Sequence, residues 1–162
     1  MLPRIYTLKN LDIGKLSVMA KPVSGEWIED EFIGFKRLEI DCIVSLLEKD
    51  EEAEVGLKLE SQLCAQNGIE FLSFEIPDRN IPNKNRALGF ATQLVDRLNE
   101  NKHVAIHCRA GIGRTAIMAS AVLVKLGVDP MEAMKQISLV RGVEIPDTQE
   151  QKEWVLSLAN AT

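Results

Sequence analysis

Apolar and polar positions alternate along the chain with two different periods, which predicts a succession of strands and helices. Short runs of mostly apolar residues are typical of buried strands, and they cover residues 16–19, 40–47, 69–75 and 104–107. Segments with apolar residues at helical spacing cover 26–37, 50–67, 84–101, 115–126, 131–141 and 148–160. This alternation predicts an α/β fold with a mostly parallel central sheet of about four or five strands flanked by helices. We expect one domain over residues 1–162.

Several features are expected to be structural. Residues 115–126 are apolar nearly all round, which is typical of a buried central helix. Trp27, Phe32 and Phe35 have helical spacing and are expected in the core. The acidic run 49–54 is expected to be a solvated helix start, where carboxylates suit the helix dipole.

Composition narrows the possible partners. Of 162 residues, 46% are apolar, which is enough for a proper core, and the net charge is −5 without a basic run. This charge argues against nucleic acid as a constitutive partner. No apolar stretch reaches membrane-spanning length, and the first residues lack the apolar region of a signal peptide.

The cysteines indicate the redox setting. There are three, an odd number without metal-binding spacing, so we expect a reduced cytoplasmic protein with no metal and no cofactor. Cys42 and Cys64 are expected to be buried as apolar residues.

The strongest chemical signal lies in residues 104–116, which read V-A-I-H-C-R-A-G-I-G-R-T-A. Cys108 follows a strand and precedes a helix, so loop amides and the positive helix end would favour its thiolate. Gly111 and Gly113 allow a tight loop. Arg114 offers a planar fork of donors that can hold two phosphate oxygens.

Two neighbours support this loop. Thr115 places a hydroxyl at the helix start, where it can cap the helix or donate to the sulfur. His107 is expected to orient the loop through hydrogen bonds. These positions together predict an activated cysteine nucleophile beside an oxyanion cradle.

The residues His107, Cys108, Arg114 and Thr115 resemble the signature H-C-x5-R-[ST] of the protein tyrosine phosphatase superfamily, in particular its small, dual-specificity members. The resemblance implies that Cys108 attacks phosphorus and forms a cysteinyl-phosphate. It also implies that Thr115 helps the thiolate leave and that Arg114 binds phosphate with the loop residues Arg109, Ala110, Gly111, Ile112 and Gly113. Ala116 departs from the glycine that many members carry, and no functional loss is expected from it.

A second match is Asp78, which follows a strand and lies 30 positions before Cys108. The resemblance implies that Asp78 is the acid that protonates the leaving oxygen. The alternative is that Pro77 and Asp78 only form a turn and have no catalytic role. Glu75 and Asp147 are the next carboxylates to consider.

A third match is Thr148-x-x-Gln151, which resembles the segment that opens the last helix of small family members. The resemblance implies that Gln151 positions a water for hydrolysis of the intermediate. The alternative is a capping box at a surface helix.

The resemblance implies a phosphatase acting on phosphotyrosine and phosphoserine or phosphothreonine of protein substrates. Phosphoinositides are the alternative substrates, although the loop has only Arg109 as an extra base and Ile112 is apolar. RNA 5′-triphosphatase activity is a less favoured alternative, because the net charge of the chain is negative. An inactive phosphate-binding module would lack the cysteine, arginine or acid. The pattern G-x-G-x-x-A that begins at Gly111 also matches the dinucleotide-binding fingerprint. That fingerprint, however, is found at the first strand–helix turn of a domain.

Overall fold

The computed structural model describes residues 2–9 and 11–160 and contains a five-stranded sheet. The strand order is β1-β2-β5-β3-β4, and only the β1–β2 pair is antiparallel. The strands are β1 (Tyr6–Thr7), β2 (Lys15–Met19), β3 (Cys42–Ser45), β4 (Glu70–Ser73) and β5 (His103–His107). The expected α/β fold with a mostly parallel sheet is confirmed. The two-residue β1 was not predicted, because it is too short to show a period.

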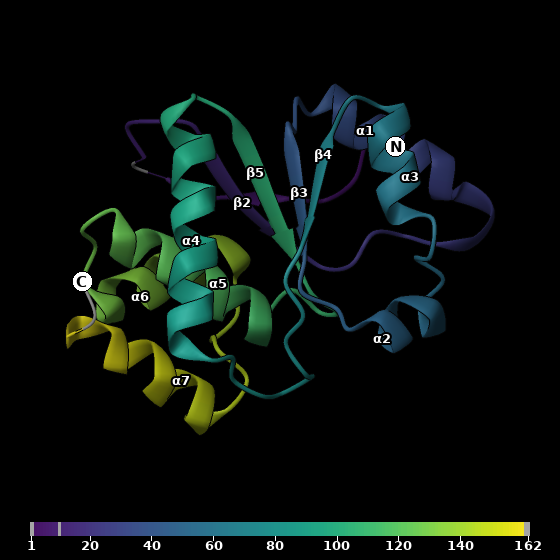
Figure 1. Ribbon diagram of the computed structural model, residues 1–162. Coiled ribbons are helices and arrows are strands. Elements are labelled where there is room, and N and C mark those ends of the chain that lie inside the picture. Colours follow the sequence, from purple (N-terminus) through teal and green to yellow (C-terminus); the bar gives the residue numbers. More distant parts are fainter. Residues whose placement is uncertain (1, 10, 161–162) are drawn as a thin grey trace.

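Helices cover both faces of the sheet (Figure 1). They are α1 (Ile28–Arg37), α2 (Lys49–Glu54), α3 (Glu60–Gln66), α4 (Lys84–Asn99), α5 (Gly113–Lys125), α6 (Pro130–Arg141) and α7 (Gln149–Leu156), with 3₁₀ turns at Gly25–Trp27 and Ser157–Asn160. Helices α1 and α3 cover one face, and α4 to α7 lie on the other. Helix α5 packs against α4, α6 and α7 and is the buried central helix that the sequence predicts.

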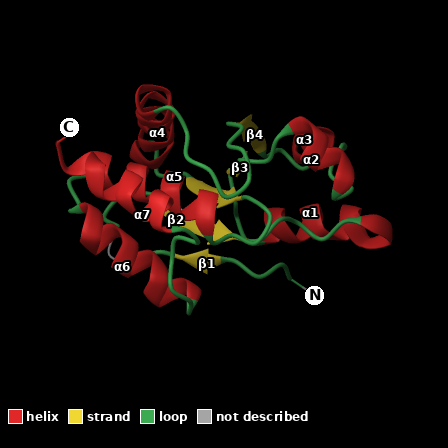
Figure 2. Cartoon of the chain, turned by 90° about the horizontal axis from the view of Figure 1, so that it is seen from below, coloured by secondary structure: helices red, strands yellow, loops and turns green. Residues whose placement is uncertain are grey.

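The parallel register brings three strand ends together. His107 at the end of β5 lies opposite Met19 of β2 and Ser45 of β3. Figure 2 views the molecule from the side on which the loops after these strands emerge. Since β5 has a strand on each side, the residue that follows it, Cys108, lies at the middle of this edge. In open α/β sheets this is the edge at which ligands bind.

The helix expected over 50–67 is instead two helices, α2 and α3. The chain turns at Gly56, whose φ is +75°. The Leu57 N–H donates to the Glu52 carbonyl at 2.8 Å, and the Gly56 N–H donates to the Ala53 carbonyl at 3.3 Å. A glycine in the left-handed region is a common helix end. The break turns α3 back toward β5 and lets each helix contribute a carboxylate to the site.

The expected core is largely confirmed. Phe32, Phe35, Cys42 and Cys64 are buried, whereas Trp27 was wrongly assigned to the core and is 64% exposed. Trp27 ends the 3₁₀ turn before α1 begins, so it does not follow the buried face of that helix. Within the described residues, no helix has both the length and the apolar character needed to span a membrane.

Candidate active site

The loop after β5 folds against the end of β2. Gly111 has a φ of +75°, and a Cβ added there would meet the backbone of Met19 and Ala20, with the Ala20 nitrogen at 2.7 Å. Only glycine fits this approach without displacing a strand end. The Lys21 N–H donates to the Arg109 carbonyl at 3.0 Å and closes the same contact.

Arg141, at the end of α6, holds the outer side of this loop. Its Nη2 donates to the Ala110 carbonyl at 2.8 Å, and its Nε donates to the Gly111 carbonyl at 3.4 Å. Its guanidinium carbon lies 4.5 Å from the centre of the Tyr6 ring. In a trans peptide the C=O and N–H point in opposite directions, so these contacts turn the following amides toward the inside of the loop. Sequence reasoning missed Arg141.

Cys108 lies at the start of the loop with its side chain almost buried. The Thr115 hydroxyl donates to the Cys108 sulfur at 3.0 Å, as the sequence suggested. Helix α5 begins at Gly113, two residues before the predicted start, so its positive end faces the loop. The sulfur thus lies between a hydroxyl donor and the N-terminal end of a helix.

Arg114 is held by a carboxylate of α2. Its Nη1 and Nη2 donate to Glu51 Oε1 and Oε2 at 2.7 and 2.8 Å, and Nη1 also donates to the Ile76 carbonyl at 3.0 Å. The Arg114 hydrogen bond is the main reason why the pKa of Glu51 lies below its ordinary value. The expectation that the whole acidic run 49–54 is solvated was therefore wrong for Glu51, which is buried against Arg114.

Arg109, the other base in the loop, faces the same helix. Its Nε lies 3.3 Å from Glu51 Oε2, and its Nη2 lies 3.3 Å from Glu54 Oε2. Its charge is thus shared with two carboxylates of α2.

Asp78 lies beside Arg114, with its Oδ1 3.2 Å from Nη2, and its side chain is 56% exposed. The segment 77–82 that carries it, here called the acid segment, turns tightly where the Asn80 N–H donates to the Pro77 carbonyl at 3.0 Å. Helix α7 holds this segment at two carbonyls. Gln151 Nε2 donates to the Asn80 carbonyl and Trp154 Nε1 to the Pro82 carbonyl, each at 3.1 Å.

These residues surround a cavity of about 160 Å³. It is lined by Asp78, Arg79, Cys108, Arg109, Ala110, Gly113, Arg114 and Asp147. The structure thus brings Cys108, Arg114 and Asp78 together from three separate parts of the chain. Of the other predicted site residues, Gly111, Ile112, Thr115, His107 and Gln151 do not line the cavity.

His107 lies behind the loop and has no exposure. Its Nε2 lies 2.6 Å from Glu60 Oε2, and its Nδ1 lies 3.0 Å from the Cys108 carbonyl. Burial alone would lower the pKa of His107, but the charge and hydrogen bond of Glu60 and the Cys108 carbonyl outweigh it and raise the pKa. His107 therefore links Glu60 of α3 to the backbone at the start of the loop. Its partner Glu60 was missed.

Gln151 forms the capping box that was the alternative interpretation. Its N–H donates to the Thr148 hydroxyl at 3.1 Å, and its Oε1 accepts from the Thr148 N–H at 3.2 Å. The side chain is fully buried. It links α7 to the acid segment rather than opening into the cavity.

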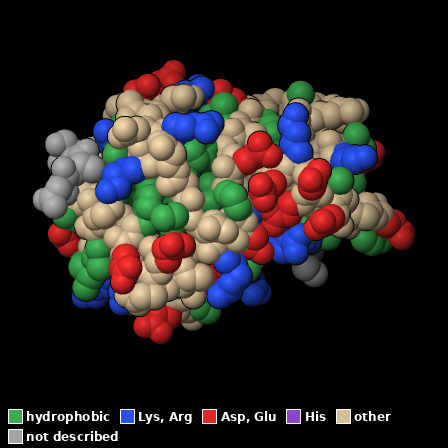
Figure 3. Space-filling view, turned by 60° about the horizontal axis from the view of Figure 1, so that its bottom comes forward, with side chains coloured by type: hydrophobic (Ala, Val, Ile, Leu, Met, Phe, Trp, Pro, Cys, Tyr) green, Lys and Arg blue, Asp and Glu red, His purple; other side chains and the backbone are tan. Residues whose placement is uncertain are grey.

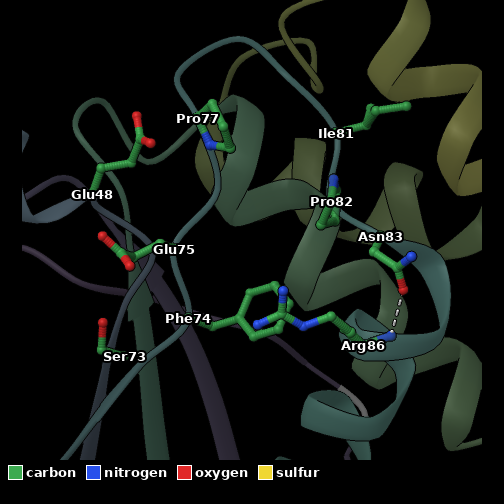
Figure 4. A pocket seen from close by; sticks show the side chains of 9 residues that line it. All are labelled: Glu48, Ser73, Phe74, Glu75, Pro77, Ile81, Pro82, Asn83 and Arg86. Carbon is green, nitrogen blue, oxygen red and sulfur yellow. Dashed lines mark hydrogen bonds between the residues drawn. The ribbon is translucent and has the colours of Figure 1, made fainter.

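A second pocket, of about 460 Å³, lies along the acid segment (Figure 4). Glu75 lines this pocket together with Glu48, and its Oε1 accepts from the Lys49 N–H at 2.8 Å. Arg86 also lines this pocket. Of the two carboxylates considered as alternatives to Asp78, Glu75 lines this second pocket and not the Cys108 cavity, whereas Asp147 lines the Cys108 cavity.

The face that carries the cavity is acidic on one side. Acidic side chains gather there toward α2 (Figure 3), whose six residues, K-D-E-E-A-E, include four acids.

The described residues contain no group of three or more His, Cys, Asp or Glu side chains that could hold a metal ion.

Comparison with protein families places most of the chain in a known family. Residues 17–128 match the family described as "Tc-R-P: Polymorphic toxin system, DSP-PTPase phosphatase". A curated relative, cyclin-dependent kinase inhibitor 3 of Rattus norvegicus, is 30% identical over 82 residues, which are 49% of this chain and 39% of that protein. The match thus spans less than half the length of that relative.

Two solved structures resemble the whole chain. Kinase-associated phosphatase with its catalytic-site cysteine replaced by serine has a TM-score of 0.90 at 19% identity, over 99% of this chain and 96% of that one. Tk-PTP in its active form has a TM-score of 0.80 at 26% identity, over the full length of both chains. The first shows the likeness of fold, and the second adds a likeness of sequence.

Proposed function

The chain belongs to the DSP-PTPase phosphatase family, and from this premise we propose that it hydrolyses phosphomonoesters of proteins through a cysteinyl-phosphate on Cys108. The observation that carries the proposal is the meeting of Cys108, Arg114 and Asp78 at one small cavity. A nucleophile, an oxyanion-binding fork and an acid are the three groups that this reaction needs.

We assign a step of this reaction to each group. The Cys108 sulfur attacks phosphorus, and the P–O bond to the leaving group breaks while Asp78 donates its proton to the departing oxygen. Arg114 and the loop amides hold the phosphoryl oxygens during this transfer. Arg114 is already oriented by Glu51, so little ordering is needed when phosphate arrives. In the second step water attacks phosphorus, and the Thr115 hydroxyl stabilises the sulfur as it leaves.

The surroundings of the cavity favour substrates with a single phosphate. A phosphoinositide with further phosphates needs cations beside the loop. Arg109 is paired with Glu51 and Glu54, which leaves Arg79 of the cavity lining to meet a further phosphate. The acidic side toward α2 repels additional phosphates as well. Phosphorylated proteins are therefore the proposed substrates, and phosphoinositides remain the alternative. Three free cysteines support a reducing, cytoplasmic setting.

The test is a comparison of kcat/KM for phosphotyrosine and phosphoserine peptides, 4-nitrophenyl phosphate and vesicles that contain a phosphoinositide. We expect peptides and the aryl phosphate to be hydrolysed and the vesicles to be poor substrates. Higher kcat/KM on the vesicles would replace the protein substrate with the lipid. Cys108→Ser is the control: it should lose turnover yet still bind an oxyanion such as tungstate, and turnover by a pure preparation would reject the covalent mechanism.

A further inference from the structure

The larger pocket beside the Cys108 cavity takes no part in the proposed bond-breaking steps. Its volume is about 460 Å³, against about 160 Å³ for the cavity. The acid segment is a wall of both: Pro77 and Pro82 line the larger pocket, whereas Asp78 lines the cavity. A substrate whose phosphate enters the cavity therefore brings its neighbouring residues close to this pocket.

Hydrogen bonds fix the pocket relative to the phosphate loop. The carbonyl of Ile76, the residue after Glu75, accepts from Arg114 Nη1 at 3.0 Å. Glu51 Oε1 accepts from the same Arg114 nitrogen at 2.7 Å and from the Glu48 N–H at 3.3 Å. The guanidinium to which we assign phosphate binding thus also ties down the backbone that carries the two acids of the pocket, Glu48 and Glu75.

These two acids have no cation beside them. Within residues 2–9 and 11–160, neither Glu48 nor Glu75 forms an ion pair. Glu75 Oε1 accepts from the backbone N–H of Lys49 at 2.8 Å. Burial, with the charges of Glu60 and Glu75, raises the pKa of Glu52 above its ordinary value. The acids around Glu75 therefore repel one another, and a cation brought to them is attracted.

The rest of the pocket suits an aliphatic chain. Phe74, Ile81 and Pro82 are half-buried and form an apolar wall. In Figure 4 the two carboxylates lie on one side of the pocket and Arg86 lies on the other. A long side chain that ends in a cation can lay its methylene groups on the wall and place its charge at the carboxylates, away from Arg86.

We propose that this pocket binds a lysine or arginine side chain of the substrate protein, an assignment that rests on the proposed phosphatase function. The basic residue lies within about four positions of the phosphorylated one, because an extended chain advances by only about 3.3 Å per residue. The phosphate and the basic side chain then bind on the two sides of the acid segment. Glu48 and Glu75 determine which phosphoproteins are preferred and take no part in breaking bonds.

The experiment uses phosphotyrosine peptides of otherwise neutral sequence. One residue, at each position from four before to four after the phosphotyrosine, is lysine, norleucine or glutamate. The kcat/KM for lysine divided by that for norleucine measures the effect of the charge, since the two side chains have similar stems. We expect this ratio to be about five at one position or more in the wild type, and to fall as salt is added. Glutamate at the same position should be the poorest of the three.

Glu75→Gln removes the charge and keeps an oxygen that can accept from the Lys49 N–H. In this variant and in Glu48→Gln the lysine-to-norleucine ratio should move toward one, and in the double variant it should reach one. Glu29→Gln makes the same change in net charge at an exposed acid of α1 and should keep the wild-type ratio. Each ratio is taken within one variant, so a general loss of activity does not affect it.

A wild-type ratio near one at every position would overturn the role of the pocket and leave the phosphatase function standing, because the peptides are still hydrolysed. An unchanged ratio in the double variant would overturn it too. So would a preference for glutamate that Arg86→Gln abolishes, since the pocket would then act through its base. Hydrolysis of none of the peptides would reject the protein phosphatase function itself, which is a separate result.

Discussion

Glu51 accepts hydrogen bonds from both terminal nitrogens of Arg114, at 2.7 and 2.8 Å, and both side chains are buried. The pair joins α2 to the start of α5. It fixes the plane of the guanidinium before any phosphate binds, so the oxyanion site is formed in advance.

Glu51→Gln should therefore lower both stability and activity. The amide cannot accept two hydrogen bonds from the fork, and Arg114 is left as a poorly compensated buried charge. Breaking such a pair costs about 3 kcal/mol or more in the free energy of unfolding, and kcat should fall by at least ~10-fold. Urea unfolding and 4-nitrophenyl phosphate turnover are the measurements. Glu54→Gln, which loses only an exposed contact to Arg109, is the control, and equal behaviour of the two variants would show that Glu51 does not orient Arg114.

The buried pair of His107 and Glu60 should make stability fall at alkaline pH. The pKa of His107 is raised above its ordinary 6.5 in the folded protein, so the folded state binds a proton more tightly than the unfolded state. The resulting stabilisation is complete below pH 6.5 and is lost as the pH rises through the higher folded pKa. Glu52 also faces His107 and adds to the rise.

Urea unfolding of wild type and Glu60→Gln at several pH values between about 6 and 9 measures this effect. We expect the variant to be less stable at pH 6 and its stability to decline less as the pH rises. Glu29→Gln, an exposed acid of α1, should keep the wild-type slope. If the free energy of unfolding of Glu60→Gln changed with pH as steeply as that of wild type, the pair of His107 and Glu60 would not hold the extra proton.

Peroxide should inactivate the protein through Cys108 and leave the other cysteines intact. Burial, with the charge of Glu70, raises the pKa of Cys42 to about 12, and burial also raises the pKa of Cys64. These two thiols stay protonated near neutral pH and react slowly, because the thiolate is the reactive form. Peptide mass spectrometry after brief peroxide treatment should find Cys108 oxidised first and the loss reversed by a thiol. Earlier oxidation of Cys42 or Cys64 would contradict the assignment of the nucleophile.

Asp78→Asn should slow the first step according to the leaving group. With alkyl phosphates such as phosphoserine the loss in kcat/KM should be on the order of a hundred-fold, because the departing alkoxide needs a proton. With 4-nitrophenyl phosphate the loss should be much smaller. The alkaline limb of the pH–rate profile should flatten in the same variant. Equal losses for both substrates, with an unchanged alkaline limb, would remove Asp78 from the role of acid.

The sequence predicted the part of the site that is contiguous in the chain. Cys108, Arg114 and Thr115 lie within one strand–loop–helix unit, whose local geometry follows from its apolar run, its glycines and its helix start. Asp78 could be found as well, because its distance from Cys108 along the chain and its place after a strand are both visible in the sequence.

The supporting residues could not be found in this way, because tertiary packing alone brings them to the site. Glu51 is one of four acids in α2 and caps that helix by accepting from the Glu48 N–H, so it cannot be told from its solvated neighbours. Glu60 reaches His107 only because the chain turns at Gly56, where a continuous helix was expected. Gly56 was the one available signal, since glycine often ends a helix.

Arg141 and Tyr6 meet on the outside of the phosphate loop. This contact affects the stage of synthesis at which the loop can be held in place. A chain that has left the ribosome only as far as residue 128 already carries the entire stretch that matches the family, including Cys108 and Arg114. It still lacks α6, so nothing from Arg141 yet holds the carbonyls of Ala110 and Gly111. The contacts that hold the outer side of the loop thus come from α6 and β1, both of which lie outside the stretch that matches the family.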